Sequence, residues 1–315
     1  MKRRTLGSSG IEVGPLALGG NVFGWTADEA TSFRVLDAFV AAGQNLIDTA
    51  DVYSRWAPGN GGGESETIIG RWLKQSGQRA NVVIATKVGM VMGPGEKGLS
   101  RAYILRAVER SLNRLQVDTI DLYQSHQDDE ATPQEETLGA FGELVAKGKV
   151  RAIGASNFTA ERLATALCIS KESKLPGYVC LQPGYNLYDR AGYESGVEML
   201  CLREALAVIP YYSLGAGFLT GKYRSAADLA KGPRGAKVKN YLNDRGFRIL
   251  AALDQVAARY QTTPGKVAIA WLLARPSITA PIASATSVEQ LQDLIDATRL
   301  TLDADAVKSL NEASA

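Results

Sequence analysis

The sequence contains little histidine and little cysteine. Its 315 residues include one histidine and three cysteines. A single imidazole excludes a zinc site of three histidines and the paired-histidine motif of metalloproteases. Cys168, Cys180 and Cys201 are widely spaced and form no Cys-x-x-Cys pair, so they favour neither a disulfide framework nor a zinc site. This usage is typical of a reducing compartment, and we expect a cytoplasmic protein without a bound metal.

Charge of one sign and long apolar runs are also missing. Thirty-five Lys and Arg residues face 33 Asp and Glu residues, which argues against a surface built for nucleic acid. The longest uncharged stretch, residues 205–221, is interrupted by Pro210 and glycines, so it is not expected to cross a membrane. The basic residues near the start precede no apolar run and do not indicate a signal peptide. We expect neither nucleic acid nor a membrane as a partner.

Glycine is plentiful, but the usual glycine motifs for phosphate binding are absent. Residues 215–223 read Gly-Ala-Gly-Phe-Leu-Thr-Gly-Lys-Tyr, whose glycine spacing is one residue too long for the dinucleotide fingerprint. The segment also fails the P-loop pattern, because Ala216 replaces its first glycine and Tyr223 its Ser or Thr. The sequence has no Gly-x-Ser-x-Gly motif and no Tyr-x-x-x-Lys motif. These absences argue against the corresponding nucleotide-binding, hydrolase and reductase classes.

Short apolar runs alternate with amphipathic segments along the chain. Buried strands are predicted at residues 16–18, 45–47, 82–86, 119–123, 150–154, 178–181, 207–211 and 278–282. Helices are predicted between them, including residues 28–42, which end at Gly43, and residues 101–115, which follow an N-capping Ser100. Pro133 and Pro264 are expected at the first positions of two further helices.

Eight strands with intervening helices imply parallel β/α units joined by right-handed crossovers. The chain has no internal repeat and no Pro- or Ser-rich linker, so we predict one (β/α)8 barrel domain over residues 1–315. Residues 3–6 and 11–13, joined by a turn at residues 7–10, predict a β-hairpin before the first barrel strand. In such a barrel the functional residues stand at the carboxyl ends of the strands.

Polar side chains stand where three consecutive predicted strands end. Asp48, Lys87 and His126 are separated by 39 residues each, which is one β/α unit, and Tyr53 follows Asp48 in its loop. Taken singly, each has an ordinary structural explanation: Asp48 as a turn cap, Tyr53 as packing, Lys87 as a rim lysine and His126 as a satisfied structural residue. Their joint position on one rim predicts a catalytic site.

With these residues in place, the sequence resembles the aldo-keto reductases from about residue 4 to about residue 302. The resemblance is carried by Leu18-Gly-Gly-Asn-Val-Phe-Gly24, Asp48-Thr-Ala-Asp-Val-Tyr53, Gly63-Glu-Ser-Glu66, Thr86-Lys87, Ile120-Asp-Leu-Tyr-Gln-Ser-His126, Gly154-Ala-Ser-Asn-Phe158, Gln182 and Pro210-Tyr211. It implies a (β/α)8 barrel that reduces small-molecule aldehydes or ketones with NADPH, less often NADH. It also implies that Asp48, Tyr53, Lys87 and His126 form the catalytic tetrad.

The chemistry of such a tetrad follows from the residue types. Hydride addition to a carbonyl builds an alkoxide, which needs a proton at the same place. A phenol with a pKa of about 10 is a weak acid at neutral pH, but a nearby ammonium stabilises its anion. Lys87, held by Asp48, is expected to supply that charge, so that Tyr53 acts as general acid, or as base in alcohol oxidation. His126 is expected to orient the substrate oxygen.

The resemblance also implies where the cofactor lies. Ser156, Asn157 and Gln182 would hydrogen-bond the nicotinamide carboxamide, and Tyr211 would stack on its ring. The other expected cofactor contacts are Gly20, Asn21, Val22, Asp48, Tyr212, Ser213, Leu214, Gly215, Gly217, Lys222, Ser284, Ala285, Thr286, Ser287 and Gln290. Small residues allow close backbone approach to a pyrophosphate, and a helix N-terminus favours phosphate. Barrel packing of Tyr211 and ordinary helix capping by residues 284–287 are the structural alternatives.

Some positions depart from the family pattern. Many relatives carry Arg or Lys for a 2′-phosphate where this chain has Ser287 and Gln290, so that Lys222, Arg234 or Lys237 would have to supply the charge. Gln127 follows the tetrad histidine, where Trp is frequent, and Tyr212-Ser213-Leu214 stands where many relatives read Ser-Pro-Leu. Trp25, Tyr53, Trp56 and His126, with residues 55–63 and the basic segment 223–245, are expected to shape the substrate pocket.

Two other functions are compatible with these residues. A regulatory subunit of the same fold would bind the cofactor with little turnover, as the channel-associated β subunits do. A barrel aldolase would use Lys87 to form a Schiff base. The sequence leaves open the substrate, the physiological direction of the reaction and the oligomeric state.

Overall fold

Eight parallel strands form the centre of the molecule. The computed structural model describes residues 2–315. The strands are β3 (Ala17–Gly19), β4 (Leu46–Asp48), β5 (Val83–Val88), β6 (Ile120–Ser125), β7 (Val150–Ser156), β8 (Tyr178–Gln182), β9 (Ala207–Val208) and β10 (Ile282–Ala283). They follow the order β10-β3-β4-β5-β6-β7-β8-β9. The ring closes where Thr279 N donates to Val208 O at 2.8 Å and Ile282 N donates to Pro210 O at 2.9 Å. The predicted (β/α)8 barrel is confirmed.

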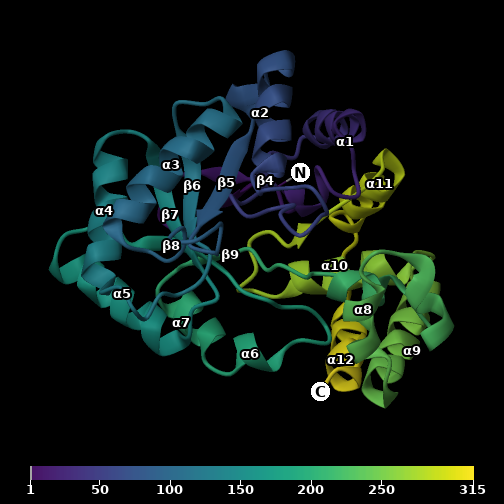
Figure 1. Cartoon of the computed structure of the whole chain (residues 1–315). Coiled ribbons are helices and arrows are strands. Elements are labelled where there is room, and N and C mark those ends of the chain that lie inside the picture. The colour runs from purple at the N-terminus through teal and green to yellow at the C-terminus, as the bar shows by residue number, and fades with distance from the viewer. Residues whose placement is uncertain (1) are drawn as a thin grey trace.

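Helices surround the strands (Figure 1). The α-helices are α1 (Glu29–Ala41), α2 (Glu64–Ser76), α3 (Arg101–Leu115), α4 (Gln134–Ala146), α5 (Ala160–Glu172), α6 (Ala191–Glu194), α7 (Val197–Arg203), α8 (Gly235–Val238), α9 (Asp244–Arg259), α10 (Pro264–Ala274), α11 (Val288–Ala297) and α12 (Ala304–Ala313). Short 3₁₀ helices are η1 (Gly20–Val22), η2 (Gln78–Asn81), η3 (Gly215–Thr220), η4 (Ala226–Lys231) and η5 (Lys239–Tyr241). Among residues 2–315, no helix has the length and apolarity that a membrane span requires.

The predicted N-terminal hairpin is confirmed. Strands β1 (Arg4–Thr5) and β2 (Glu12–Val13) pair antiparallel. Leu6, Ile11 and Val13 are buried with apolar residues from the barrel interior, so the hairpin covers the end of the barrel where the strands begin. Gly7 has a φ of 52°, and a Cβ there would lie 2.2 Å from Val179 O. Glycine is needed at this turn because the hairpin lies directly against β8.

Element boundaries differ from the prediction at the last strands and at one helix. The ladder at β9 covers only Ala207–Val208, and β10 begins at Ile282, because the chain on either side makes single hydrogen bonds rather than a continuous ladder. Pro133 is the N-cap of α4, with an extended ψ of 136°, and not its first helical residue. Pro264 does begin α10, and the Ser100 side chain caps α3 as predicted.

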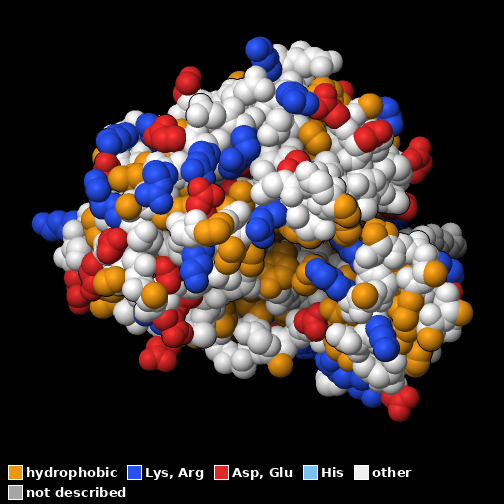
Figure 2. All heavy atoms as spheres, in the orientation of Figure 1, with side chains coloured by type: hydrophobic (Ala, Val, Ile, Leu, Met, Phe, Trp, Pro, Cys, Tyr) orange, Lys and Arg blue, Asp and Glu red, His pale blue; other side chains and the backbone are white. Residues whose placement is uncertain are grey.

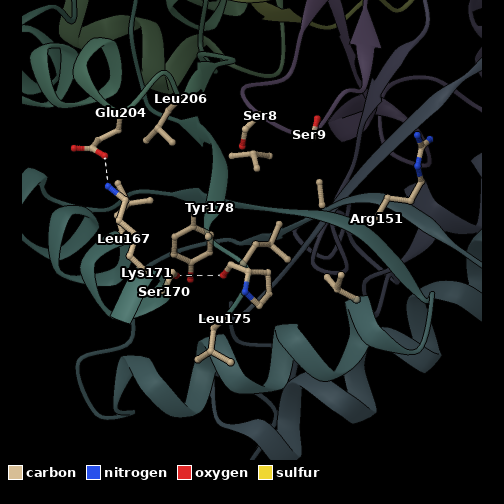
Figure 3. Close-up of a pocket in the computed structure, with 16 residues that line it drawn as sticks. Ser8, Ser9, Arg151, Leu167, Ser170, Lys171, Leu175, Tyr178, Glu204 and Leu206 are labelled. Atoms are coloured by element: carbon tan, nitrogen blue, oxygen red, sulfur yellow. Dashed lines mark hydrogen bonds and ion pairs between the residues drawn. The ribbon is translucent and has the colours of Figure 1, made fainter. Parts of the chain in front are cut away.

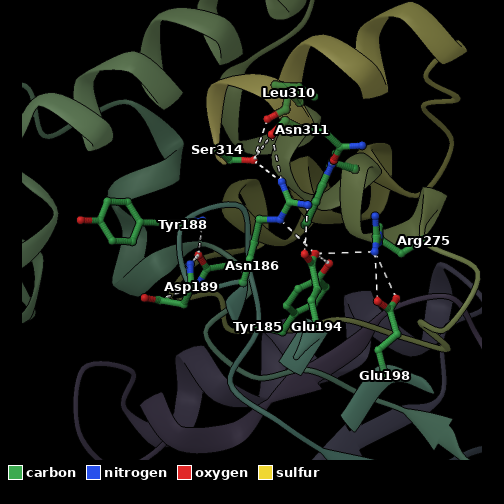
Figure 4. A network of polar contacts seen from close by, with 12 residues as sticks. Tyr185, Asn186, Tyr188, Asp189, Glu194, Glu198, Arg275, Leu310, Asn311 and Ser314 are labelled. Carbon is green, nitrogen blue, oxygen red and sulfur yellow. Dashed lines mark hydrogen bonds and ion pairs between the residues drawn. The ribbon is translucent and has the colours of Figure 1, made fainter. Parts of the chain in front are cut away.

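A polar network joins the C-terminal helix to the barrel (Figure 4). Arg190 binds Glu194 at 2.9 Å and donates to Ser314 Oγ at 2.7 Å, next to the last turn of α12. Arg275 at the end of α10 binds Glu198 of α7 at 3.1 Å. The network therefore holds α6, α7, α10 and α12 together. On the face drawn in Figure 2, basic and acidic side chains are interspersed, and the surface is hollowed near the centre, where hydrophobic side chains lie.

The packing of α2 on α3 provides a test of the fold. A Cβ at Gly70 in α2 would lie 2.1 Å from Arg114 O, whereas a Cβ at Gly139 in α4 would meet nothing within 4 Å. We expect Gly70→Ala to lower the free energy of unfolding by about 1–3 kcal/mol through overpacking. The matched control Gly139→Ala should raise it by about 0.5–1 kcal/mol, because alanine favours helix. Urea unfolding measures both, and equal effects would contradict the described helix contact.

Candidate active site

Four side chains expected on one rim of the barrel are brought together. Asp48 ends β4, Lys87 lies in β5, and His126 follows β6 directly. Lys87 Nζ lies 2.7 Å from Asp48 Oδ2, 2.8 Å from Thr49 O and 2.9 Å from Tyr53 Oη. These acceptors match the three N–H bonds of an ammonium. The charge is therefore fixed in one place, against the tyrosine hydroxyl.

The Lys87–Asp48 ion pair is fully buried. Both side chains are at most 1% exposed. The other Asp48 oxygen, Oδ1, accepts from Gln182 Nε2 at 2.9 Å and more weakly from Gln124 Nε2 at 3.4 Å. Buried charges need such partners on every side, because desolvation otherwise exceeds the Coulomb attraction. Gln124 was not among the predicted site residues, although it precedes His126 by two residues and the alternation along β6 places it on the inner face.

Burial shifts the pKa values of the cluster. The pKa of Tyr53 is raised well above its ordinary value, first by burial and then by the Asp48 charge. Burial also lowers the pKa of Lys87, against the opposing effect of Asp48. The phenol therefore holds its proton at neutral pH, and the ammonium faces any anion formed when that proton is donated.

His126 is buried beside Tyr53. Their ring centroids are 5.9 Å apart, and burial, followed by the Lys87 charge, lowers the pKa of the imidazole well below its ordinary value. A neutral imidazole has one N–H donor. Nδ1 is buried without a hydrogen-bond partner among residues 2–315, so Nε2 is the nitrogen able to meet a ligand. Asn157 Nδ2 donates to the His126 carbonyl at 2.9 Å and fixes its position.

The residues expected at the nicotinamide lie next to the tetrad and bind one another. Tyr211 Oη donates to Asn157 Oδ1 at 2.8 Å, and Ser156 Oγ donates to Gln182 O at 2.8 Å. Asn157 has a φ of 58°, a left-handed conformation that often marks functional positions. The Gln182 amide nitrogen donates to Asp48 Oδ1 at 2.9 Å and to Gln124 Oε1 at 3.2 Å, so Oε1 is the Gln182 atom left for the expected contact with a carboxamide.

Two segments are expected at the cofactor phosphates, one around η3 and one before α11, and the first of them turns sharply. Tyr212, Ala216 and Gly217 have φ values of 56°, 55° and 97° at the start of η3, so the backbone there turns sharply. A Cβ at Gly217 would lie 3.5 Å from Lys222 Cε, which places Lys222 along this turn. Three further residues expected at the cofactor lie between Tyr211, the residue expected at the nicotinamide, and this turn: Ser213, Leu214 and Gly215.

On the other side, Ser284 Oγ donates to Asn21 Oδ1, which joins the ends of β10 and β3. Ser287 caps α11 by accepting from Gln290 N at 3.3 Å, and Gln290 Oε1 accepts from Thr286 N at 3.0 Å. Residues 284–290 contain no Lys or Arg. The end of the site at α11 is therefore polar and without a cation of its own.

Aromatic rings lead away from the tetrad. Tyr53 contacts Trp56 at 5.9 Å between ring centroids, and Trp56 contacts Trp25 at 5.8 Å. Asn60 Nδ2 donates to Gly24 O at 2.9 Å, so the loop after Tyr53 is held against the loop after η1. The expected substrate-side residues thus form one continuous wall beside Tyr53.

Comparison with known proteins agrees with this geometry. Residues 15–315 match the aldo/keto reductase family. This chain is a member of that family. Similar proteins include the uncharacterized oxidoreductase YrpG of Bacillus subtilis, which is 37% identical over 99% of this chain and 95% of that protein. The aldo-keto reductase yakc [NADP(+)] of Schizosaccharomyces pombe is 32% identical over 93% and 84%. A probable voltage-gated potassium channel subunit beta of Arabidopsis thaliana is 31% identical over 93% and 90%.

In this aldo/keto reductase a second buried polar cluster lies behind the tetrad. Glu66 accepts from Thr86 Oγ1 at 2.6 Å and from Arg114 Nε at 2.7 Å. Asp51 is buried beside it, and neither of its carboxylate oxygens has a hydrogen-bond partner among residues 2–315. Burial and the Glu66 charge raise the pKa of Asp51 to about 8. The sequence indicated this cluster only through the segments 48–53 and 63–66, without a role for either acid.

A cavity of about 380 Å³ lies at the other end of the barrel (Figure 3). It is lined by the hairpin turn at Ser8, by Leu167 of α5 and by Tyr178 at the start of β8. The Lys171–Glu204 ion pair of 2.8 Å borders it. None of the tetrad residues lines this cavity, and its charged groups are paired. The candidate active site is therefore the side-chain cluster around Lys87 and not this cavity.

Asp51 predicts a pH-dependent stability. Its pKa of about 8 exceeds the unfolded value of about 3.9, so the folded state binds more protons between these limits. The free energy of unfolding should therefore fall as pH rises through this window, by at most about 1.4 kcal/mol per pH unit. We expect Asp51→Asn to remove this slope, so that the variant gains stability over the parent protein between pH 5 and pH 8. Urea unfolding at both pH values measures the gain.

The exposed Asp118, changed to Asn, is the control and should show the parent slope. An Asp51→Asn protein with an unchanged slope would show that Asp51 is charged in the folded state at neutral pH.

Proposed function

We propose that this aldo/keto reductase is an NAD(P)H-dependent enzyme that reduces an aldehyde or ketone to an alcohol, with Tyr53 as general acid. The contact that supports this most strongly is Lys87 Nζ against Tyr53 Oη at 2.9 Å, in a buried site. A protonated phenol, a fixed ammonium and a neutral imidazole converge there. This set of groups suits proton donation to a developing alkoxide.

The residues beside the tetrad fit a nicotinamide. Ser156 and Asn157 offer hydroxyl and amide groups, and Tyr211 offers an aromatic face, which suits a flat ring bearing a carboxamide. Asn157, Tyr212 and Ala216, which all have positive φ values, lie in the segments that follow β7 and β9. When bound there, the reduced cofactor would supply the hydride.

The chain's own residues would then manage the proton. Nε2 of the neutral His126 would donate a hydrogen bond to the carbonyl oxygen and orient it. Tyr53 would transfer its phenolic proton to that oxygen as negative charge develops. Lys87, held by Asp48, would stabilise the tyrosinate, and the reverse path would serve alcohol oxidation.

A cofactor-binding regulatory subunit is the second candidate. Relatives named as probable potassium channel subunits beta support it, because they match nearly the whole chain. The two functions differ in turnover: a reductase consumes NADPH with a panel of aldehydes at enzymatic rates, and a regulatory subunit binds it with little consumption.

The role of Tyr53 is tested by Tyr53→Phe, which removes only the hydroxyl. We expect kcat to fall by about 10²- to 10⁴-fold, because a positioned proton donor is lost. Binding of NADPH, followed by protein fluorescence, should stay within about twofold, because no cofactor contact is proposed for this hydroxyl. The control Tyr260→Phe removes a hydroxyl that binds Asp303 N at the end of α9 and should leave kcat unchanged. An unchanged kcat in Tyr53→Phe would contradict the mechanism.

The proposed cofactor is NADPH, with NADH as the alternative. Lys222 is the cation placed along the phosphate-binding turn, and one relative is named as NADP(+)-dependent. We expect Lys222→Met to raise the Kd of NADPH more than that of NADH, by a factor of about 10, as for one lost charged hydrogen bond. Fluorescence titration with both cofactors measures this ratio. An equal change for both would assign Lys222 to the pyrophosphate that they share, and tighter binding of NADH by the parent protein would overturn the NADPH proposal.

A further inference from the structure

A closed ring of hydrogen bonds joins Asp48, Gln124 and Gln182 in the barrel interior. Gln182 Nε2 donates to Asp48 Oδ1 at 2.9 Å and to Gln124 Oε1 at 3.2 Å. Gln124 Nε2 closes the ring by donating to Asp48 Oδ1 at 3.4 Å. All three residues are at most 2% exposed. Gln124 is the one member of this ring to which the proposed reaction gives no part.

The strand order brings these three side chains into one layer. They come from β4, β6 and β8, and alternate strands of a (β/α)8 barrel share each interior layer. Two positions earlier on the same strands, the residues are apolar and buried: Leu46, Leu122 and Cys180. The ring of polar groups therefore stands between the apolar interior of the barrel and the rim that carries Tyr53 and His126.

A glycine gives Gln124 the room to reach β8. Gly154 on β7 is the register partner of Gln124, and a Cβ at Gly154 would lie 3.0 Å from Gln124 Cγ. A larger residue at this position would push the glutamine aside. Gln124 therefore lies over the backbone of β7, and its side chain reaches Gln182 two strands away.

The ring fixes the orientation of the Gln182 amide. A carboxylate accepts hydrogen bonds and donates none, so both glutamines must turn their nitrogens towards Asp48. Gln124 Oε1 takes the second N–H bond of the Gln182 amide, which leaves that nitrogen fully used. No residue among 2–315 donates to Gln182 Oε1. This oxygen is therefore the group that Gln182 can offer to a ligand.

We propose that Gln124 is a positioning residue for the cofactor: by holding the Gln182 amide, it directs an acceptor to the N–H bonds of the nicotinamide carboxamide. This inference rests on the cofactor binding of the proposed function. An amide that donates to a carboxylate is polarised, which strengthens its oxygen as an acceptor. Without Gln124, a buried N–H of Gln182 loses its acceptor, so the amide would turn towards another partner and the acceptor would no longer be fixed.

The test combines a variant with a change in the cofactor. Gln124→Met keeps the length of the side chain and removes its hydrogen bonds. The 3-acetylpyridine analogue of NADP⁺ keeps the carbonyl of the carboxamide and replaces the amino group with a methyl group. We expect the parent protein to bind NADP⁺ about 3- to 10-fold more tightly than the analogue, as for one net hydrogen bond. In Gln124→Met this ratio should fall below about twofold. Fluorescence titration gives all four Kd values without turnover.

Two further variants separate positioning from packing. Leu122→Met is the matched control, because it places the same side chain on the same face of β6, one layer below, and it should keep the parent ratio. Gly154→Ala displaces Gln124 without removing its amide and should lower the ratio in the same direction. Urea unfolding establishes which variants are folded, and Gly154→Ala decides the question if Gln124→Met is not.

Steady-state kinetics provide a second readout. We expect the KM for NADPH to rise about 3- to 10-fold in Gln124→Met, as for one lost net hydrogen bond. The kcat at saturating NADPH should stay within about threefold, because Gln124 takes no part in the Lys87–Tyr53 contact. A fall in kcat with an unchanged KM would contradict a role in holding the cofactor.

The outcomes distinguish this inference from the reductase function. An unchanged ratio in folded Gln124→Met, or an equal loss of the ratio in Leu122→Met, would overturn the inference alone if the parent protein reduces aldehydes. The expected ratios without turnover of any aldehyde would support the positioning role and refute the reductase function. A parent protein that binds neither NADP⁺ nor NADPH would overturn both.

Discussion

The buried ion pair between Lys87 and Asp48 is the interaction on which the rest of the site depends. In bulk water such a pair contributes little, but here both side chains are withdrawn from solvent, so each must satisfy the other. The third acceptor of Lys87, besides Asp48 and Thr49 O, is the Tyr53 hydroxyl. The requirement to satisfy a buried ammonium thus places a phenol where a proton can be donated.

The barrel meets this requirement through strand order. Adjacent parallel strands β4, β5 and β6 deliver an acid, a base and an imidazole to one rim, at intervals of one β/α unit. Gln182 reaches Asp48 from β8, across the interior of the barrel. The hairpin covers the opposite end, so the interior is closed there. The buried Glu66 adds negative charge behind Lys87, which favours the protonated form of that lysine.

Residue patterns were sufficient for the barrel, the hairpin and the meeting of Asp48, Tyr53, Lys87 and His126 on one rim, because each depends on local periodicity and on spacing between strands. The Ser100 cap of α3 and Pro264 at the start of α10 are local signals of the same kind. Features that depend on burial could not be predicted this way. The raised pKa of Tyr53 follows first from the removal of its phenol from water, which only three-dimensional packing determines.

A double-mutant cycle on the ion pair tests the central claim most directly. Asp48→Asn and Lys87→Met would each strand a buried partner, and each should lower the free energy of unfolding by about 3–5 kcal/mol. The double variant should recover most of that loss, because no charge is left unpaired, while carbonyl reduction stays abolished in all three proteins. Stability losses that simply add, or a double variant that turns over at the parent rate, would contradict the account.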